Sequence, residues 1–260
     1  PASAERQLEN AENNPYAKAL LLQHLANKPL YEKDYKKAAS QLEEALAQES
    51  LSEYAAETMR YQLAQLHMAG EQYQKVIDVL APRITAYEKD AKSAVVKPGS
   101  ESYLALGAAY AGLKDYKNAA PYIKKAIASE KNPPREWKQL LLALYTNAGD
   151  YKNAAGELEA MVRDDPKDKV AWMQLSTLYL KAKQKDKALS TLRLAHRLGM
   201  LKSEKELLHL AKLFMNAGVP FTAGSLLEEW LDKGLLDRKT IHLELLAAAW
   251  TAAQEQDKAI

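Results

Sequence analysis

The chain has 260 residues, of which 47% are hydrophobic and 27% charged, and this allows one or two domains with a buried core. Its formal net charge of +2 comes from interspersed Lys, Arg, Asp and Glu, which argues against a large phosphate-binding face and a nucleic-acid partner. Cysteine is absent, which excludes disulfides, thiolate catalysis and Cys-based metal sites.

A repeated segment indicates how the chain is organised. The residues Asp-Tyr-Lys-Asn-Ala-Ala occur at 115–120 and again at 150–155. We name the first Ala of this segment, and its equivalent in the other copies, the anchor. The anchors are Ala38, Val76, Ala119, Ala154, Ala188, Ala223 and Ala259. Their spacings are 38, 43, 35, 34, 35 and 36 residues, and a period near 34 is typical of the tetratricopeptide repeat, which is one helix-turn-helix unit.

The repeats are expected in the following order. Two degenerate repeats occupy about residues 19–90, and an insert at 91–99, rich in loop-forming residues, follows them. The regular repeats are 100–133, 135–168, 169–202 and 204–237, and a truncated repeat begins at 240. The sequence therefore predicts an all-α fold, a right-handed α-solenoid superhelix of about six and a half tetratricopeptide repeats, in a single domain over 1–260.

Small residues recur at two places in each repeat. Thirteen residues before the anchor most repeats have Leu, as at Leu106, and the next residue is Gly, Ala or Ser, as at Gly107. An aromatic residue such as Tyr110 often lies nine residues before the anchor. The first helix of each repeat is expected to cross the second at these small residues, because a larger side chain would push the helices apart. The truncated repeat is expected to leave Leu243, Leu246 and Trp250 without a covering helix, which favours self-association.

Motifs for catalysis are missing from the sequence. The five histidines do not occur three or four residues apart, so helical metal-ligand spacing is absent. The sequence also has no Gly-x-Ser-x-Gly, Gly-x-Gly-x-x-Gly or phosphate-binding Gly-Lys-Ser/Thr motif. We therefore expect no enzyme activity, no cofactor and no metal, and no apolar run is long enough to span a membrane.

Binding is expected on the concave face, which the first helices of the repeats line. The candidate partner-binding residues on this face are Tyr61, Gln65, Leu104, Ala108, Gln139, Asn147, Met173, Gln174, Thr177, Lys181, His209, Lys212 and Asn216. Amide and hydroxyl groups can hydrogen-bond a peptide backbone, Met can accommodate apolar side chains, and the Lys residues favour a partner with some negative charge. The small, apolar residues from Leu104 to Gly112 could receive a partner helix or could pack against a neighbouring helix of the same chain.

Two resemblances extend this interpretation. Residues 100–260 resemble tetratricopeptide proteins, and the runs at 207–214, 218–223 and 243–247 resemble bacterial repeat proteins associated with TonB-type transport systems. The second resemblance implies a periplasmic location, which also suits the absence of Cys and a start without Met; the cytoplasm is the alternative.

The leading functional hypothesis is a protein-interaction scaffold that binds a peptide segment or helix in the concave groove. The alternatives are a self-assembling structural protein, which would form homo-oligomers through the truncated repeat, and a docking subunit for a cell-wall enzyme or protease.

Overall fold

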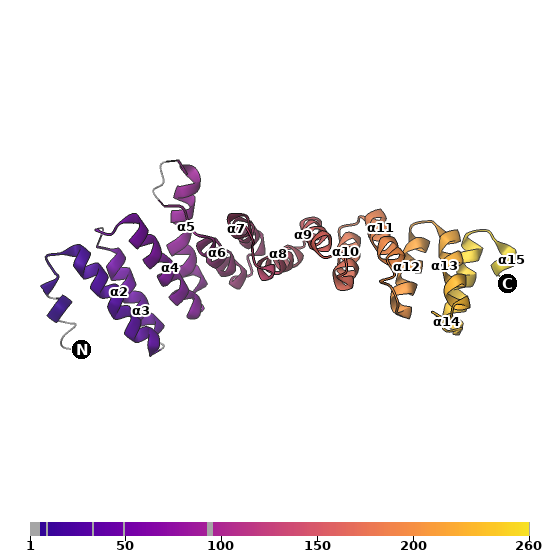
Figure 1. Cartoon of the computed structure of the whole chain (residues 1–260), viewed down its shortest axis with the longest axis horizontal. Helices are drawn as coiled ribbons and strands as arrows, with labels where there is room; N and C mark the ends of the chain where they lie inside the picture. Colours follow the sequence, from indigo (N-terminus) through magenta and orange to yellow (C-terminus); the bar gives the residue numbers. More distant parts are fainter. Residues whose placement is uncertain (1–5, 9, 33, 49, 93–95, 260) are drawn as a thin grey trace. The chain divides into compact units, whose positions relative to one another are not determined.

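The structure is a computed structural model that describes residues 6–8, 10–32, 34–48, 50–92 and 96–259 (Figure 1). It divides into two compact units, Pro1–Ala148 (unit 1) and Gly149–Ile260 (unit 2), which are described separately below. Only helices, turns and loops occur among the described residues, so the predicted all-α class is confirmed. No described helix combines the length and apolar character required to cross a membrane.

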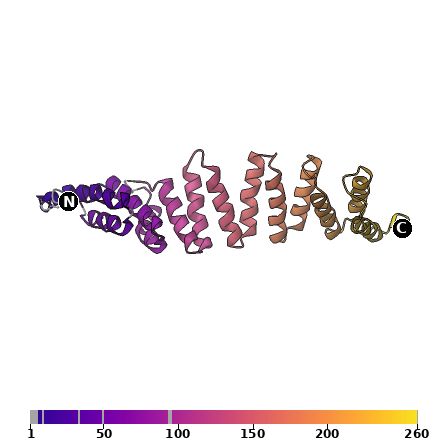
Figure 2. The same cartoon turned by 90° about the horizontal axis from the view of Figure 1, so that it is seen from below.

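Each unit is a succession of antiparallel helices. In unit 1 they are α2 (Pro15–Tyr31), α3 (Tyr35–Leu46), α4 (Glu53–Ala69), α5 (Tyr73–Lys89), α6 (Ser100–Gly112), α7 (Tyr116–Ser129) and α8 (Arg135–Asn147). In unit 2 they are α9 (Tyr151–Asp164), α10 (Lys169–Lys181), α11 (Lys185–Arg197), α12 (Glu204–Asn216), α13 (Pro220–Asp232), α14 (Thr240–Ala252) and α15 (Gln256–Ala259). Within a unit each of these helices contacts the next one in the sequence, as two views show (Figures 1 and 2).

The anchors lie where the two helices of a repeat cross. All anchors from Ala38 to Ala223 are fully buried, which confirms this part of the sequence prediction. A Cβ atom added at Gly107 of α6 would lie 2.5 Å from Cδ1 of Ile123 and 3.2 Å from the carbonyl oxygen of Ala119 on α7. In the repeat of α10 and α11, the Ser176 hydroxyl donates to the carbonyl oxygen of Ala188 at 3.0 Å. The backbones therefore approach closely because the residues between them are small.

The turn between the two helices of a repeat has a fixed geometry. In the repeats with anchors from Val76 onward, the residue five before the anchor has a left-handed backbone, with φ of 61° at Lys114, 60° at Lys183 and 71° at Gly218. The next N–H donates back to the third-last residue of the first helix, as from Asp115 to the carbonyl oxygen of Tyr110 at 2.9 Å. This is the Schellman arrangement, and it satisfies carbonyl groups that the helix end would otherwise leave unpaired.

The described part of the insert is attached to α5. This helix extends to Lys89, and its last turns project beyond α6 in Figure 1. The Arg83 guanidinium donates to the carbonyl oxygen of Val96 at 2.7 Å and pairs with Glu57 of α4 at 3.2 Å. Residues 93–95 of the predicted insert lie outside the described residues. Arg83 therefore links the insert at Val96 to α5, while its ion pair with Glu57 fixes the guanidinium against α4.

The expected exposure of Trp250 is wrong. Trp250 is 1% exposed, because Gly224 on α13 leaves room for its ring: an added Cβ there would lie 2.8 Å from it. The Phe221 ring packs edge-on against Trp250 with centroids 5.4 Å apart, and Lys258 of α15 lies over the indole. Leu246 is partly buried, and only Leu243 of the three expected residues is exposed.

The crossing at Ala188 generates a prediction. Ala188→Trp should lower the free energy of unfolding by about 3 kcal/mol, the upper end of the overpacking range, since the side chain is fully enclosed. Urea unfolding followed by circular dichroism measures this loss. Ala160→Trp is the control, because Ala160 is exposed on α9, and its effect should stay within about 0.5 kcal/mol. Equal stability of the two variants would contradict the assigned crossing.

Candidate functional site

Two of the pockets that the described residues form, one in each unit, are lined mainly by the first helices of the repeats. The unit 1 pocket is a cavity of about 200 Å³ formed mainly by α2 and α4. The unit 2 pocket is a cavity of about 560 Å³ formed by α10 and α12. Because residues four apart lie on the same face of a helix, each helix contributes side chains from successive turns to its pocket.

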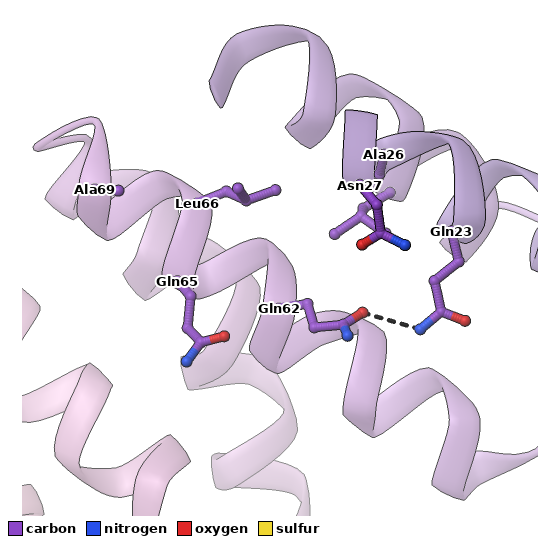
Figure 3. A pocket seen from close by; sticks show the side chains of 8 residues that line it. Gln23, Ala26, Asn27, Gln62, Gln65, Leu66 and Ala69 are labelled. Carbon is purple, nitrogen blue, oxygen red and sulfur yellow. Dashed lines mark hydrogen bonds between the residues drawn. The ribbon is translucent and has the colours of Figure 1, made fainter. Parts of the chain in front are cut away.

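The unit 1 pocket is lined by amides above an apolar floor. The amides belong to Gln23, Asn27, Gln62 and Gln65, and the floor to Ala26, Leu42, Leu66 and Ala69. Figure 3 shows Gln23 and Gln62 pointing toward each other from facing helices, with Gln65 further along α4. The Gln23 amide nitrogen donates to the Gln62 amide oxygen at 2.9 Å, which bridges α2 and α4. None of the described residues that line this pocket is charged.

Tyr61 lies beside this pocket on α4. Burial of its phenol raises the pKa above its usual value, and the nearby Glu101 carboxylate of α6 raises it further. A hydrogen bond with the Gln65 side chain acts in the opposite direction. Tyr61 is therefore a neutral hydroxyl at physiological pH, and it orients Gln65 at the edge of the pocket.

The unit 2 pocket combines cationic, polar and apolar groups. Its lining residues are Met173 and Thr177 from α10, and Ser203, Lys205, Glu206, Leu208, His209 and Lys212 from the start and face of α12. Burial lowers the pKa of His209, and the ammonium group of Lys212 lowers it further. His209 is therefore uncharged at neutral pH, with one ring nitrogen available as a donor and the other as an acceptor.

Glu206 fixes the geometry at one end of this pocket. Its carboxylate accepts from the N–H groups of Lys202 and Ser203 at 3.0 Å each and pairs with Lys169 of α10 at 2.7 Å. The Ser203 hydroxyl in turn accepts from the Glu206 N–H, which completes a capping box. Burial alone would raise the pKa of Glu206, but these hydrogen bonds lower it to about 2. Glu206 is thus a carboxylate that is charged at neutral pH and joins α10 to α12.

Comparisons with known proteins agree with this fold. Residues 145–197, which end at the last residue of α11, match the family model described as Tetratricopeptide repeat. The fold is a tetratricopeptide-repeat α-solenoid. No curated protein sequence matches the chain.

Solved structures resemble the solenoid at low sequence identity. A chain of the Naa15/Naa10 complex bound to HypK-THB matches 93% of this chain with 19% identity and a TM-score of 0.63. This chain spans 35% of the length of that one. YrrB, described as a tetratricopeptide protein with an unusual peptide-binding site, matches 80% of this chain and 99% of its own, with 21% identity and a TM-score of 0.49. A tetratricopeptide repeat protein from Parabacteroides merdae matches 95% of this chain and 91% of its own, with 16% identity and a TM-score of 0.45.

The candidate binding residues separate into three groups in the solenoid. Those that line a pocket are Gln65 in unit 1 and Met173, Thr177, His209 and Lys212 in unit 2. Those on the first helices of repeats but outside the pocket linings are Tyr61, Gln139, Asn147, Gln174, Lys181 and Asn216. Lys181 lies over the Tyr151 ring, 5.3 Å from its centroid. Their part in binding stays a prediction.

Leu104 and Ala108 form the third group, because they lie in the small, apolar stretch of α6. Both are partly buried, and Leu104 packs against the buried clusters on either side of α6. The neighbouring Gly112 is approached by Tyr73 of α5, whose ring would lie 2.7 Å from an added Cβ. Of the two interpretations of this small, apolar stretch, packing within the same chain is the one favoured.

Gln23 and Asn27 are pocket residues that the sequence reasoning missed. The signal was the repeat register. Asn27 lies eleven residues before its anchor Ala38, the position that Gln65 and Lys212 occupy in their own repeats. The first repeat matches the signature loosely, and this obscures the register in its first helix. Leu208, Ser203 and Glu206 were also missed, and the last two depend on the conformation of the loop before α12.

The Glu206 network predicts a specific pH dependence of stability. The pKa of Glu206 is about 2 in the fold and 4.5 without its partners, so its contribution is complete above pH 4.5 and is lost as the pH falls toward 2. Glu206→Gln should therefore lower the free energy of unfolding by about 1–3 kcal/mol at pH 7. The difference from wild type should shrink on acidification below pH 4.5.

Urea unfolding of the two proteins between pH 7 and pH 2.5 measures this difference. Glu228→Gln is the matched control, because Glu228 is exposed on α13, and its effect should stay within about 0.5 kcal/mol at every pH. A wild-type advantage over Glu206→Gln that persists unchanged at pH 2.5 would contradict the assigned role.

Proposed function

We propose that the chain is a non-enzymatic scaffold that binds a segment of another protein, as an extended peptide or a helix, along the first helices of its repeats. The observation that carries this proposal is that a pocket opens at equivalent repeat positions in both units. The residues eleven before the anchors, Asn27 and Gln65 in unit 1 and Thr177 and Lys212 in unit 2, all line a pocket.

The chemistry of the linings supports a peptide ligand. Side-chain amides in unit 1 can donate to and accept from a peptide backbone, while the floor of Ala and Leu side chains can receive a small apolar group. The floor of the unit 2 pocket includes the flexible Met173 side chain, which adapts to apolar groups of different shape. Among the described residues, no group of three or more His, Cys, Asp and Glu is placed to hold a metal ion.

Filling the pockets tests this function. Peptides that bind the purified chain are first selected from a random peptide library, and their affinities are measured by fluorescence anisotropy. Thr177→Trp and Ala69→Trp should each lower the affinity for peptides that bind in the corresponding pocket by about tenfold or more. Both side chains line a cavity, and the indole would occupy it.

Two exposed positions on second helices provide the controls. Lys124→Trp on α7 and Lys152→Trp on α9 should leave affinity within about twofold, because neither residue lines a pocket. Circular dichroism verifies that each variant is folded. Selected peptides whose affinity is insensitive to both pocket variants would refute groove binding.

The proposed location is the bacterial periplasm, where the scaffold would serve a TonB-type envelope complex. The absence of Cys supports this location, as does the resemblance carried by residues 207–214, 218–223 and 243–247. Fractionation of the source bacterium, with an antibody against this chain, should place the protein with periplasmic marker enzymes. Recovery with cytoplasmic markers alone would refute the location and leave peptide binding intact.

Self-assembly is the competing function. The residues that favour it are Ile241 and Leu243, which are 66% and 40% exposed near the start of α14. Light scattering on the purified chain distinguishes the two functions, because a strict monomer at micromolar concentration would remove self-assembly.

A further inference from the structure

The unit 2 pocket has an excess of positive charge. Lys205 and Lys212 both line it, and both are exposed. Neither has an ion-pair partner among the residues that the structure describes, whereas Lys169 of α10 and Lys239, directly before α14, are paired with Glu206 and Glu204. The two unpaired ammonium groups therefore both contribute to a positive electrostatic potential at the mouth of the unit 2 pocket.

The carboxylate in the pocket lining does not neutralise them. Glu206 pairs with Lys169 at 2.7 Å and accepts two backbone N–H groups, so its charge is balanced on the side of α10. Burial and the ammonium group of Lys212 both lower the pKa of His209, which leaves the imidazole neutral. The pocket therefore has two uncompensated positive charges at neutral pH.

Apolar side chains lie between the cationic positions. Leu208 follows Lys205 by one turn of α12, and Met173 faces the same cavity from α10. Lys205 and Lys212 are seven residues apart, which is about 10 Å along a helix axis. In an extended peptide, residues i, i+2 and i+4 point to one side and span about 13 Å. Two acidic residues flanking one apolar residue on that side match the pocket in charge and in length.

We propose that the unit 2 pocket binds an extended acidic segment of a partner protein, with one apolar side chain between two carboxylates. This inference rests on the proposed function and specifies its ligand. In the bound state the carboxylates pair with Lys205 and Lys212, and the apolar side chain packs against Met173 and Leu208. The neutral His209 and the Thr177 hydroxyl remain available to the peptide backbone.

A pair of synthetic peptides tests the assignment. The probe is acetyl-Glu-Ala-Leu-Ala-Glu-amide, and the control is acetyl-Gln-Ala-Leu-Ala-Gln-amide, which has the same shape without charge. Titrations of the isotope-labelled chain, followed by NMR, give both the affinity and the residues that respond. The acidic peptide should bind about tenfold more tightly, its advantage should shrink as salt is raised, and the responses should centre on α10 and α12.

Matched variants connect the effect to the two lysines. Lys205→Gln with Lys212→Gln should abolish the advantage of the acidic peptide. The control is the double variant Lys152→Gln with Lys185→Gln, which removes the same charge at two exposed positions of α9 and α11. It should change the affinity for the acidic peptide less than twofold.

Three results would overturn the assignment. The first is equal affinity of the chain for the two peptides. The second is an equal loss of affinity for the acidic peptide in the two double lysine variants. The third is absence of binding of either peptide to a chain that still binds library-selected peptides in a Thr177-dependent manner. This third result would leave the proposed function standing. So would equal affinity of the two peptides with NMR responses centred on α10 and α12. Insensitivity of selected peptides to pocket filling would remove the function itself.

Discussion

The close crossing of the two helices in each repeat is the constraint on which the fold depends. Fully buried anchors such as Ala119 and Ala188, with Gly107 and Ser176 opposite them, bring the two backbones near enough for direct contact. This distance determines where the first helices of neighbouring repeats lie, and hence which of their faces remain open. The pockets exist because small residues hold the second helices on the other side of the stack.

Features that repeat with the anchors were predictable from the sequence. The burial of the anchors and the pocket positions of Gln65, Thr177 and Lys212 follow from a fixed register, because each must satisfy the same helix crossing or face. Features that depend on one contact were not predictable. Trp250 is buried because a single glycine on α13 makes space for its ring, and no periodic pattern encodes that space.

Equivalent positions in the two units carry different chemistry. In unit 1, amides bridge α2 and α4 and leave a neutral lining, which suits hydrogen bonding to a backbone. In unit 2, Lys212 occupies the repeat position that Gln65 has in unit 1, and Lys205 adds a second ammonium group two turns earlier on α12. These positive charges suit electrostatic steering of an acidic partner. A solenoid can vary such residues freely because they contribute little to the helix crossings, so specificity and stability are determined at separate positions.

Glu206 departs from that separation, since one carboxylate caps α12, holds the preceding loop and binds Lys169 on the previous repeat. The repeat that begins with α12 therefore does not contain every group that stabilises its first turn, because the ion-pair partner Lys169 belongs to α10. Exchange of this repeat without the preceding one would remove Lys169 and leave the Glu206 carboxylate without its ion pair. The physical unit at this point of the chain therefore extends beyond one sequence period.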